Sequence, residues 1–266
     1  MRILQYTFKN AALLAAFFIY GKNPEVSYIF QKIDYVDGSV PNKPVIGELS
    51  KDTLISQDHI LASAANSRAE VKSNEIIWRI GSSTVCRLMN DDDLWIRSGS
   101  VLFCADKNSS ITIKSTKSDV KFVGSGTIII EATSNGGFKF IPIEAQGYVF
   151  TSSNEKKKVS NGRLLLIIDQ PSKYGNSYDI DLSLLLKSSR LINAFPSPLP
   201  RIRKLGLAVY AQELRLKGKY NALIGDATTN KNLQMWKLDN QSLNHSNKMV
   251  SPKKDKSFFK RIFSSD

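Results

Sequence analysis

Three consecutive aspartates, Asp91, Asp92 and Asp93, follow Asn90 and form the most acidic run in the chain. Clustered carboxylates bind hard cations such as calcium, or raise one another's pKa and so serve acid–base chemistry. Calcium loops, however, space their ligands at alternate positions around a glycine turn. This run simply joins two apolar segments, so we interpret it as a solvated turn between strands.

The run Gly124-Ser125-Gly126-Thr127 has the small and hydroxylated residues of a loop that cradles phosphate. A phosphate loop is longer and leads into a helix, whose free N–H groups bind the anion. The run is too short and is followed by the strand-like residues 127–130. We interpret it as a tight bend between two strands.

Three aromatic residues, Trp78, Trp95 and Phe103, are candidates for a platform on which sugar or base rings stack. Trp78 alternates with Ile76 and Ile80, which favours packing in the core. Trp95 shares its face with Arg97, so these two residues are the better candidates for a surface contact.

The chain has two cysteines, Cys86 and Cys104, and two histidines, His59 and His245. They are too few and too scattered for a metal site or a Cys–His nucleophile. We therefore expect no metal, no cofactor and no catalytic residue.

The spacing of the two cysteines also distinguishes between two possible arrangements of the strands. A hairpin turning at Asp91 to Asp93 would pair Cys86 near Arg97 and leave Cys104 about seven residues away, roughly 20 Å and beyond disulfide reach. A solenoid with a repeat of about eighteen residues would instead stack the two cysteines. Buried free thiols are our interpretation.

The elements that must position these residues are strands. Between Ile76 and Val149, apolar and β-branched residues alternate with polar ones, and clusters of Gly, Ser, Asn and Asp interrupt them every ten or so residues. This pattern predicts an all-β core of short strands, arranged as a β-solenoid, jelly roll or sandwich. The expected strands are residues 76–80, 94–97, 101–104, 111–113, 120–123, 127–130, 138–143 and 164–168.

Two glycine turns are expected between strands. Asn135-Gly136-Gly137 supplies residues that adopt positive φ without strain, so the strands beside it should form a hairpin. Asn161-Gly162 before Leu164 predicts the same arrangement again.

After Pro171 the apolar period becomes helical, with Leu182, Leu185, Leu186 and Ile192 on one face. The prolines of residues 196–200 must end this helix. A second helix is expected over residues 201–217, with Leu205, Val209, Gln212 and Leu216 along one side and Gly218 as its stop. This helical extension should pack on the β domain.

Both ends of the chain differ from its centre. A basic flank followed by apolar residues 11–20 suits a signal peptide and is too short to span a bilayer. The end of the chain is rich in Asn, Lys and Ser, which predicts disorder. The expected division is residues 1–22 as signal peptide or hydrophobic segment, 23–170 as β domain, 171–227 as helical extension and 228–266 as disordered basic tail.

The formal net charge is +13 and the isoelectric point is about 9.6, which favours polyanionic partners. Eight basic and three acidic residues follow position 227, so about five of these charges belong to the tail and the folded part is only moderately basic. A nucleic-acid partner is therefore not expected. The tail pairs cations with bulky apolar residues and is a candidate for an anionic membrane surface, through Lys253, Lys254, Lys256, Lys260 and Arg261.

Three runs in the centre, residues 67–71, 78–85 and 96–103, resemble in order and spacing the FecR-type domain. That family has a "small-R-A" entry, an "R-x-G" turn and an "L-x-x-G-x-x-L/V" turn; residues 120–130 and 138–147 continue the match. The family positions that this resemblance implies are structural: Arg68, Ala69, Arg79, Gly81, Ser83, Gly99, Gly124, Gly126, Thr127 and Gly147.

The resemblance implies an all-β domain on the outer side of the cytoplasmic membrane, in the periplasm or cell envelope. Well-known members relay the state of a transporter to a sigma factor. Here the basic and apolar segment begins at Met1 and leaves no cytoplasmic region for that task, so we do not expect an anti-sigma role.

The leading hypothesis is a non-catalytic, FecR-like envelope protein that acts as a sensor, adaptor or structural interaction module, with an envelope protein or cell-wall component as partner. One alternative is an extracellular β-solenoid that binds or cleaves carbohydrate; cleavage would need a carboxylate pair near Trp95. The other is a basic nucleic-acid-binding protein, whose affinity would fall steeply with salt.

Overall fold

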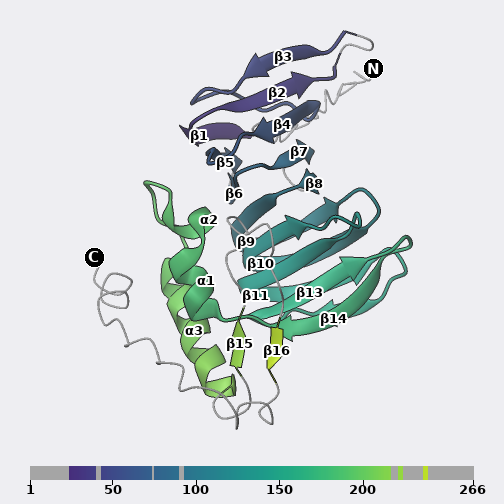
Figure 1. Ribbon diagram of the computed structural model, residues 1–266, viewed down its shortest axis with the longest axis vertical. Helices are drawn as coiled ribbons and strands as arrows, with labels where there is room; N and C mark the ends of the chain where they lie inside the picture. Colours follow the sequence, from purple (N-terminus) through teal and green to yellow (C-terminus); the bar gives the residue numbers. More distant parts are fainter. Residues whose placement is uncertain are drawn as a thin grey trace, which may run out of the picture.

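The computed structural model describes residues 24–39, 43–73, 75–89 and 93–216, together with two short strands near the end of the chain. As the sequence predicts, the core is all-β and helices follow it (Figure 1). The strands are β1 (Glu25–Phe30), β2 (Ile33–Asp37), β3 (Val45–Glu48), β4 (His59–Ser63), β5 (Arg68–Ser73), β6 (Ile76–Ile80), β7 (Val85–Met89), β8 (Asp93–Ser98), β9 (Ser100–Lys114), β10 (Asp119–Ala132), β11 (Phe138–Thr151), β12 (Lys156–Lys158), β13 (Arg163–Ile168), β14 (Lys173–Asp179), β15 (Asn221–Leu223) and β16 (Trp236–Leu238).

The long strands β9, β10 and β11 each belong to two layers of sheet. Residues 101–105 of β9 pair with β6, whereas residues 112–114 pair with β8 in parallel. In the same way β13 pairs with residues 138–140 of β11, and β12 pairs with residues 148–150. The sheet therefore folds back on itself as a two-layer sandwich.

The main core lies between the two layers. Phe103 and Phe140 come from one layer, and Phe122 comes from the other. The ring of Phe122 lies 6.3 Å from that of Phe103 and 5.6 Å from that of Phe140, and Trp78 packs on Phe103 at 5.0 Å. All four side chains are fully buried, which confirms the core position of Trp78.

In β10 and β11 the change of layer occurs at glycines. Gly126 in β10 and Gly147 in β11 have φ of 132° and 140°, a region that only glycine adopts readily. An added Cβ would overlap the carbonyl oxygen of Glu144 or Val123. The tight bend expected at residues 124–127 is present, but it does not separate two strands, because these residues lie inside β10. The glycines bend one continuous strand. Because glycines usually mark the ends of strands, the sequence predicts two strands, residues 120–123 and 127–130, where the structure has one.

Helices cover the outer face of one layer, which we call the covered layer; the other is the open layer. They are α1 (Leu182–Ser188), α2 (Arg190–Asn193) and α3 (Ile202–Leu216). Their apolar faces form a second core with outward-facing residues of β9, β10 and β11, so the expected packing of the extension on the β domain is confirmed. Asp181 caps α1 by accepting a hydrogen bond from the Leu184 N–H at 2.8 Å.

Several expected boundaries need correction. The turn at residues 135–137 does join the hairpin β10–β11, but Asn161-Gly162 does not form one, since β12 and β13 both pair with β11 instead of with each other. The strands continue through β14, inside the segment assigned to the helical extension. The strand β16 lies within the range predicted to be disordered and pairs with β15.

Residues 1–22, Gly218 and the cationic positions 253–261 lie outside the described residues. Within the part of the chain that the structure describes, no helix is both long and apolar enough to cross a membrane.

Candidate anion-binding edge

The family-motif arginine Arg79 lies on β6 beneath the helices and is fully buried. Its Nε donates to Oε2 of Glu70 at 2.9 Å, and its remaining nitrogens donate to the carbonyl oxygens of Leu191, Ile192 and Ser197 at 3.1, 3.0 and 2.6 Å. Burial lowers the pKa of Arg79, and the Glu70 carboxylate opposes that shift. The side chain therefore binds the helical extension to the sheet.

The second family-motif arginine, Arg68, has the same role. Its Nε donates to the carbonyl oxygen of Ala194 at 2.6 Å, and its guanidinium lies 3.9 Å from the centroid of the Phe30 ring. Both motif arginines thus hold the backbone at or just after α2.

The sequence does not indicate a third arginine that also joins the helical extension to the sheet. Arg201, which immediately precedes α3, donates to both carboxylate oxygens of Glu144 at 2.6 and 2.7 Å and to Asp106 at 3.2 Å. These hydrogen bonds raise the pKa of Arg201. Glu144 was the available signal, because it is the one carboxylate within the apolar run of residues 140–145; its partner 57 residues away has no local signature.

The other family positions also have structural surroundings. Thr127 is fully buried, and its hydroxyl donates to the Sγ of Cys104 at 3.5 Å. Ser83 and Gly99 adopt positive φ of 52° and 78° at turns. The remaining positions, Ala69, Gly81, Gly124, Gly126 and Gly147, are buried or half-buried in strands and turns.

The two cysteines are free and lie in different cores. Cys86 pairs with Ile96 rather than with β9, so the stacked arrangement of a solenoid is wrong and the hairpin register is close to the expected one. Burial raises the pKa of the Cys86 thiol to about 12 and also raises that of Cys104. Buried free thiols are therefore confirmed.

The polar residues considered for metal or acid chemistry are dispersed. Asp93 accepts a hydrogen bond from the Thr112 N–H at 3.1 Å and so joins β8 to β9, while residues 90–92 lie outside the described part. His59 stacks on the Tyr35 ring at 4.6 Å. Among the described residues, no group of three potential metal ligands occurs.

The outer face of the open layer carries cations and aromatic rings. Strand register places Lys121, Phe150 and Lys156 in one row across β10, β11 and β12. It places Val123, Tyr148 and Lys158 in the next row. Directly paired residues have their side chains on the same face, and five of these six are exposed, Phe150 being half-buried. We call this surface the open face.

Trp95 and Arg97, the predicted contact residues, do share one side of β8, with Trp95 half-buried and Arg97 exposed. Trp95 lies beside Lys114 of β9, which is itself paired with Asp119 at the start of β10. The structure thus places Trp95 on the open layer, but three strands, β9, β10 and β11, separate it from the lysines of β12. It does not bring Trp95 and Phe103 into one platform, because Phe103 is fully buried.

Two of the three lysines of β12 lie against aromatic rings. The Lys156 ammonium lies 3.9 Å from the centroid of the Tyr148 ring and 5.7 Å from that of Phe150. Lys157 points the other way, where its ammonium lies 5.1 Å from the Tyr174 ring and donates to Ser177 Oγ at 3.0 Å. Cation–π attraction and the hydrogen bond hold both charges in defined positions.

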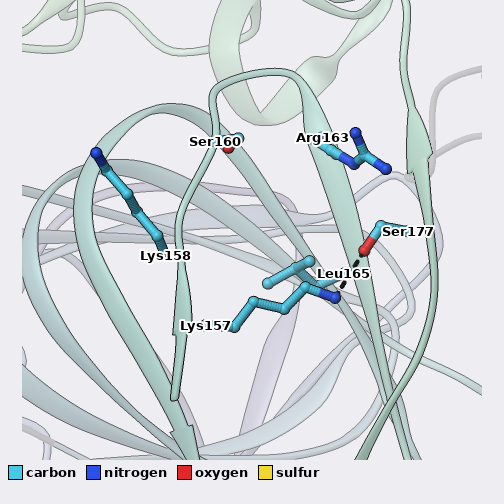
Figure 2. A pocket seen from close by; sticks show the side chains of 6 residues that line it. All are labelled: Lys157, Lys158, Ser160, Arg163, Leu165 and Ser177. Atoms are coloured by element: carbon cyan, nitrogen blue, oxygen red, sulfur yellow. Dashed lines mark hydrogen bonds between the residues drawn. The ribbon is translucent and has the colours of Figure 1, made fainter.

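A depression of about 220 Å³ is lined by residues of β12, β13 and β14 and of the segment that joins β12 to β13 (Figure 2). The figure shows Lys157 reaching across it toward Ser177, with Lys158 and Arg163 on opposite sides. None of its lining residues is acidic; they are Lys157, Lys158, Ser160, Arg163, Leu165 and Ser177. Together with Lys156 these residues form what we call the basic edge.

The basic edge was not predicted, although its signal, three consecutive lysines, is visible in the sequence. The sequence alone indicates a solvated segment; the structure shows that the consecutive side chains Lys156 and Lys157 contact different rings. In comparisons with models of protein families, with curated proteins and with solved structures, nothing matches this chain.

Proposed function

We propose that this chain is a non-catalytic interaction module of the bacterial envelope, similar to the FecR-type domain, which acts as a sensor, adaptor or structural element. The observation that carries the proposal is the common role of Arg68 and Arg79. These two arginines of the motif pattern both donate to backbone carbonyls at or just after α2. The two arginines of the motif pattern therefore join the helices to the β sandwich in one scaffold.

The two faces of this scaffold suit different tasks. The helices occupy one face through an apolar core and the buried Arg201–Glu144 pair. No element among the described residues covers the opposite face, which carries Lys121, Tyr148 and Lys158 at its surface. A domain with one face covered by helices and the other face exposed and charged is suited to binding an envelope component.

The carbohydrate alternative is favoured in its binding form by one observation, the depression in the basic edge, whose lining is cationic and hydroxylated. Cleavage by paired carboxylates has less support, because Asp93 beside Trp95 uses its carboxylate to anchor β9. Nucleic acid is the remaining alternative and is separated by the experiments below.

The compartment and the mature mass test the proposal. Cells of the native host are fractionated, and the intact mass of the protein is measured in each fraction. We expect an envelope location and a mass that lacks about the first twenty residues, as after removal of a signal peptide. A full-length chain confined to the cytoplasm would contradict the proposal and favour a nucleic-acid partner.

A further inference from the structure

We propose that the basic edge is a binding site for an acidic polysaccharide, with one charged sugar in the depression and its neighbours along Lys156 and the open face. This inference deepens the proposed function by naming the chemical class of the partner. It follows from the size of the depression, the chemistry of its lining and the way its lysines are held.

The size of the depression limits what enters it. Pockets for drug-sized ligands measure about 300–1,000 Å³, whereas this one measures about 220 Å³. It holds a single ring-sized group, and a longer ligand must continue outside. The row of Lys121, Phe150 and Lys156 crosses three strands, roughly 10 Å at the usual strand separation, and offers a path for that continuation.

The residues that line the depression suit a sugar that carries a carboxylate or another acidic group. Lys157, Lys158 and Arg163 supply three cations, and Ser160 and Ser177 supply hydroxyls that exchange hydrogen bonds with sugar hydroxyls. Asp179 lies opposite Arg163 in register, but its carboxylate is buried and accepts a hydrogen bond from Arg215. The depression therefore presents positive charge to its ligand.

The aromatic rings favour a charged sugar over a nucleic acid. Proteins that bind single-stranded nucleic acid stack bases on exposed rings. Here the Lys156 ammonium lies 3.9 Å above the Tyr148 ring, where a base would stack. The ring positions a cation instead, and recognition rests on charge and hydrogen bonding. Lysine ammonium groups act as point charges, which suits carboxylates spaced along a polymer.

The basic edge has a second physical effect that the test must separate from binding. Lysine on an edge strand prevents pairing with another chain, and in the described part of the chain β12 pairs with β11 alone. Replacing lysine by glutamate retains a charge on the edge and reverses only its sign. Charge reversal therefore tests the ligand without removing this protection.

The experiment titrates the purified full chain with polygalacturonate, with neutral dextran and with a single-stranded oligonucleotide of equal charge, at low and high salt. Polygalacturonate should bind, and salt should weaken this binding by screening. The double variant Lys158→Glu/Arg163→Glu should weaken it about tenfold or more. The matched control Lys51→Glu, an exposed loop residue remote from the edge, should leave it unchanged.

A gain of binding excludes misfolding as the explanation. Glu155 is exposed and precedes Lys156, so Glu155→Lys should tighten binding of polygalacturonate. Equal binding of dextran, tighter binding of the oligonucleotide, or no response to these charge changes would each overturn the inference. An envelope protein that ignores polygalacturonate overturns the ligand class alone, whereas a cytoplasmic protein that binds it overturns the proposed function alone.

Discussion

Arg79 on β6 and Glu70 on β5 lie directly opposite each other in strand register, and Arg79 Nε donates to Glu70 Oε2 at 2.9 Å. The arginine is fully buried, and the glutamate is nearly so. The arginine also supplies hydrogen bonds to three backbone carbonyls of the helical segment. One side chain thus neutralises a buried carboxylate and joins the sheet to the extension.

Replacing this arginine should be strongly destabilising. Arg79→Ala leaves the Glu70 carboxylate buried without its main counter-ion, which costs about 3–5 kcal/mol. Urea unfolding measures the change. Lys72→Ala is the matched control, because Lys72 also contacts Glu70, at 3.3 Å, but is half exposed; it should cost about 1 kcal/mol or less. Similar losses for both variants would contradict the structural role of Arg79.

The bend in β10 depends on glycine. Gly126→Ala places a Cβ against the Glu144 carbonyl in a positive-φ conformation, so the free energy of unfolding should fall by at least about 2 kcal/mol. Gly38→Ala meets only ordinary contact with Asp58 and should change little. Thermal unfolding of both variants measures the difference. If the two glycines proved equally tolerant, the layer change would not depend on Gly126.

The contacts of Arg79 and the bend at Gly126 show which parts of the fold can be predicted from the sequence. Alternation in residues 76–149 predicts strands and their faces, and the helical period after Pro171 predicts the extension, because both are local patterns. The sandwich was one of three open alternatives, beside a jelly roll and a β-solenoid. Choosing it requires knowing that β9, β10 and β11 run through their bends, and the glycines of β10 and β11 indicate turns equally well.

The contacts that unite distant segments were less accessible. Arg68 and Arg79 were identified through the motif pattern, but their acceptors are backbone carbonyls more than a hundred residues away. Every residue has a backbone carbonyl, so the type of a residue does not reveal that its carbonyl accepts such a hydrogen bond. The basic edge was missed for a related reason: its cations gain their positions from rings on β11 and β14.

The thiols should be unreactive in the folded protein. Both are buried, with the pKa of Cys86 raised to about 12, and thiolate is the form that reacts. A thiol reagent at neutral pH should label neither cysteine in the native state and both after denaturation, as counted by intact mass. Rapid labelling of Cys86 under native conditions would show that the core between the layers opens.

Tyr174 should confer stability that disappears at alkaline pH. Its single hydroxyl proton lies between the carbonyl oxygens of Val149 and Glu155, with the hydroxyl oxygen 2.6 Å from the first and 3.1 Å from the second, and burial raises its pKa from 10 to about 12. A raised pKa in the folded state means that this contribution is complete below pH 10 and is lost as the pH rises toward 12.

Comparison with Tyr174→Phe checks this. Near pH 8 the variant should be less stable by about 1 kcal/mol, because one hydroxyl proton is lost. The difference between the two proteins should shrink near pH 11, as measured by guanidinium unfolding at both values. A difference that stays constant or grows with pH would show that the hydroxyl makes no such contribution.

The most direct test of the central claim is co-sedimentation of the purified chain with isolated envelopes of its native host. We expect the wild-type protein and Lys51→Glu to pellet with envelopes at low salt. If the basic edge binds the envelope, Lys158→Glu/Arg163→Glu should remain largely in the supernatant. Wild-type protein that stays in the supernatant, or a double variant that pellets equally well, would contradict that claim.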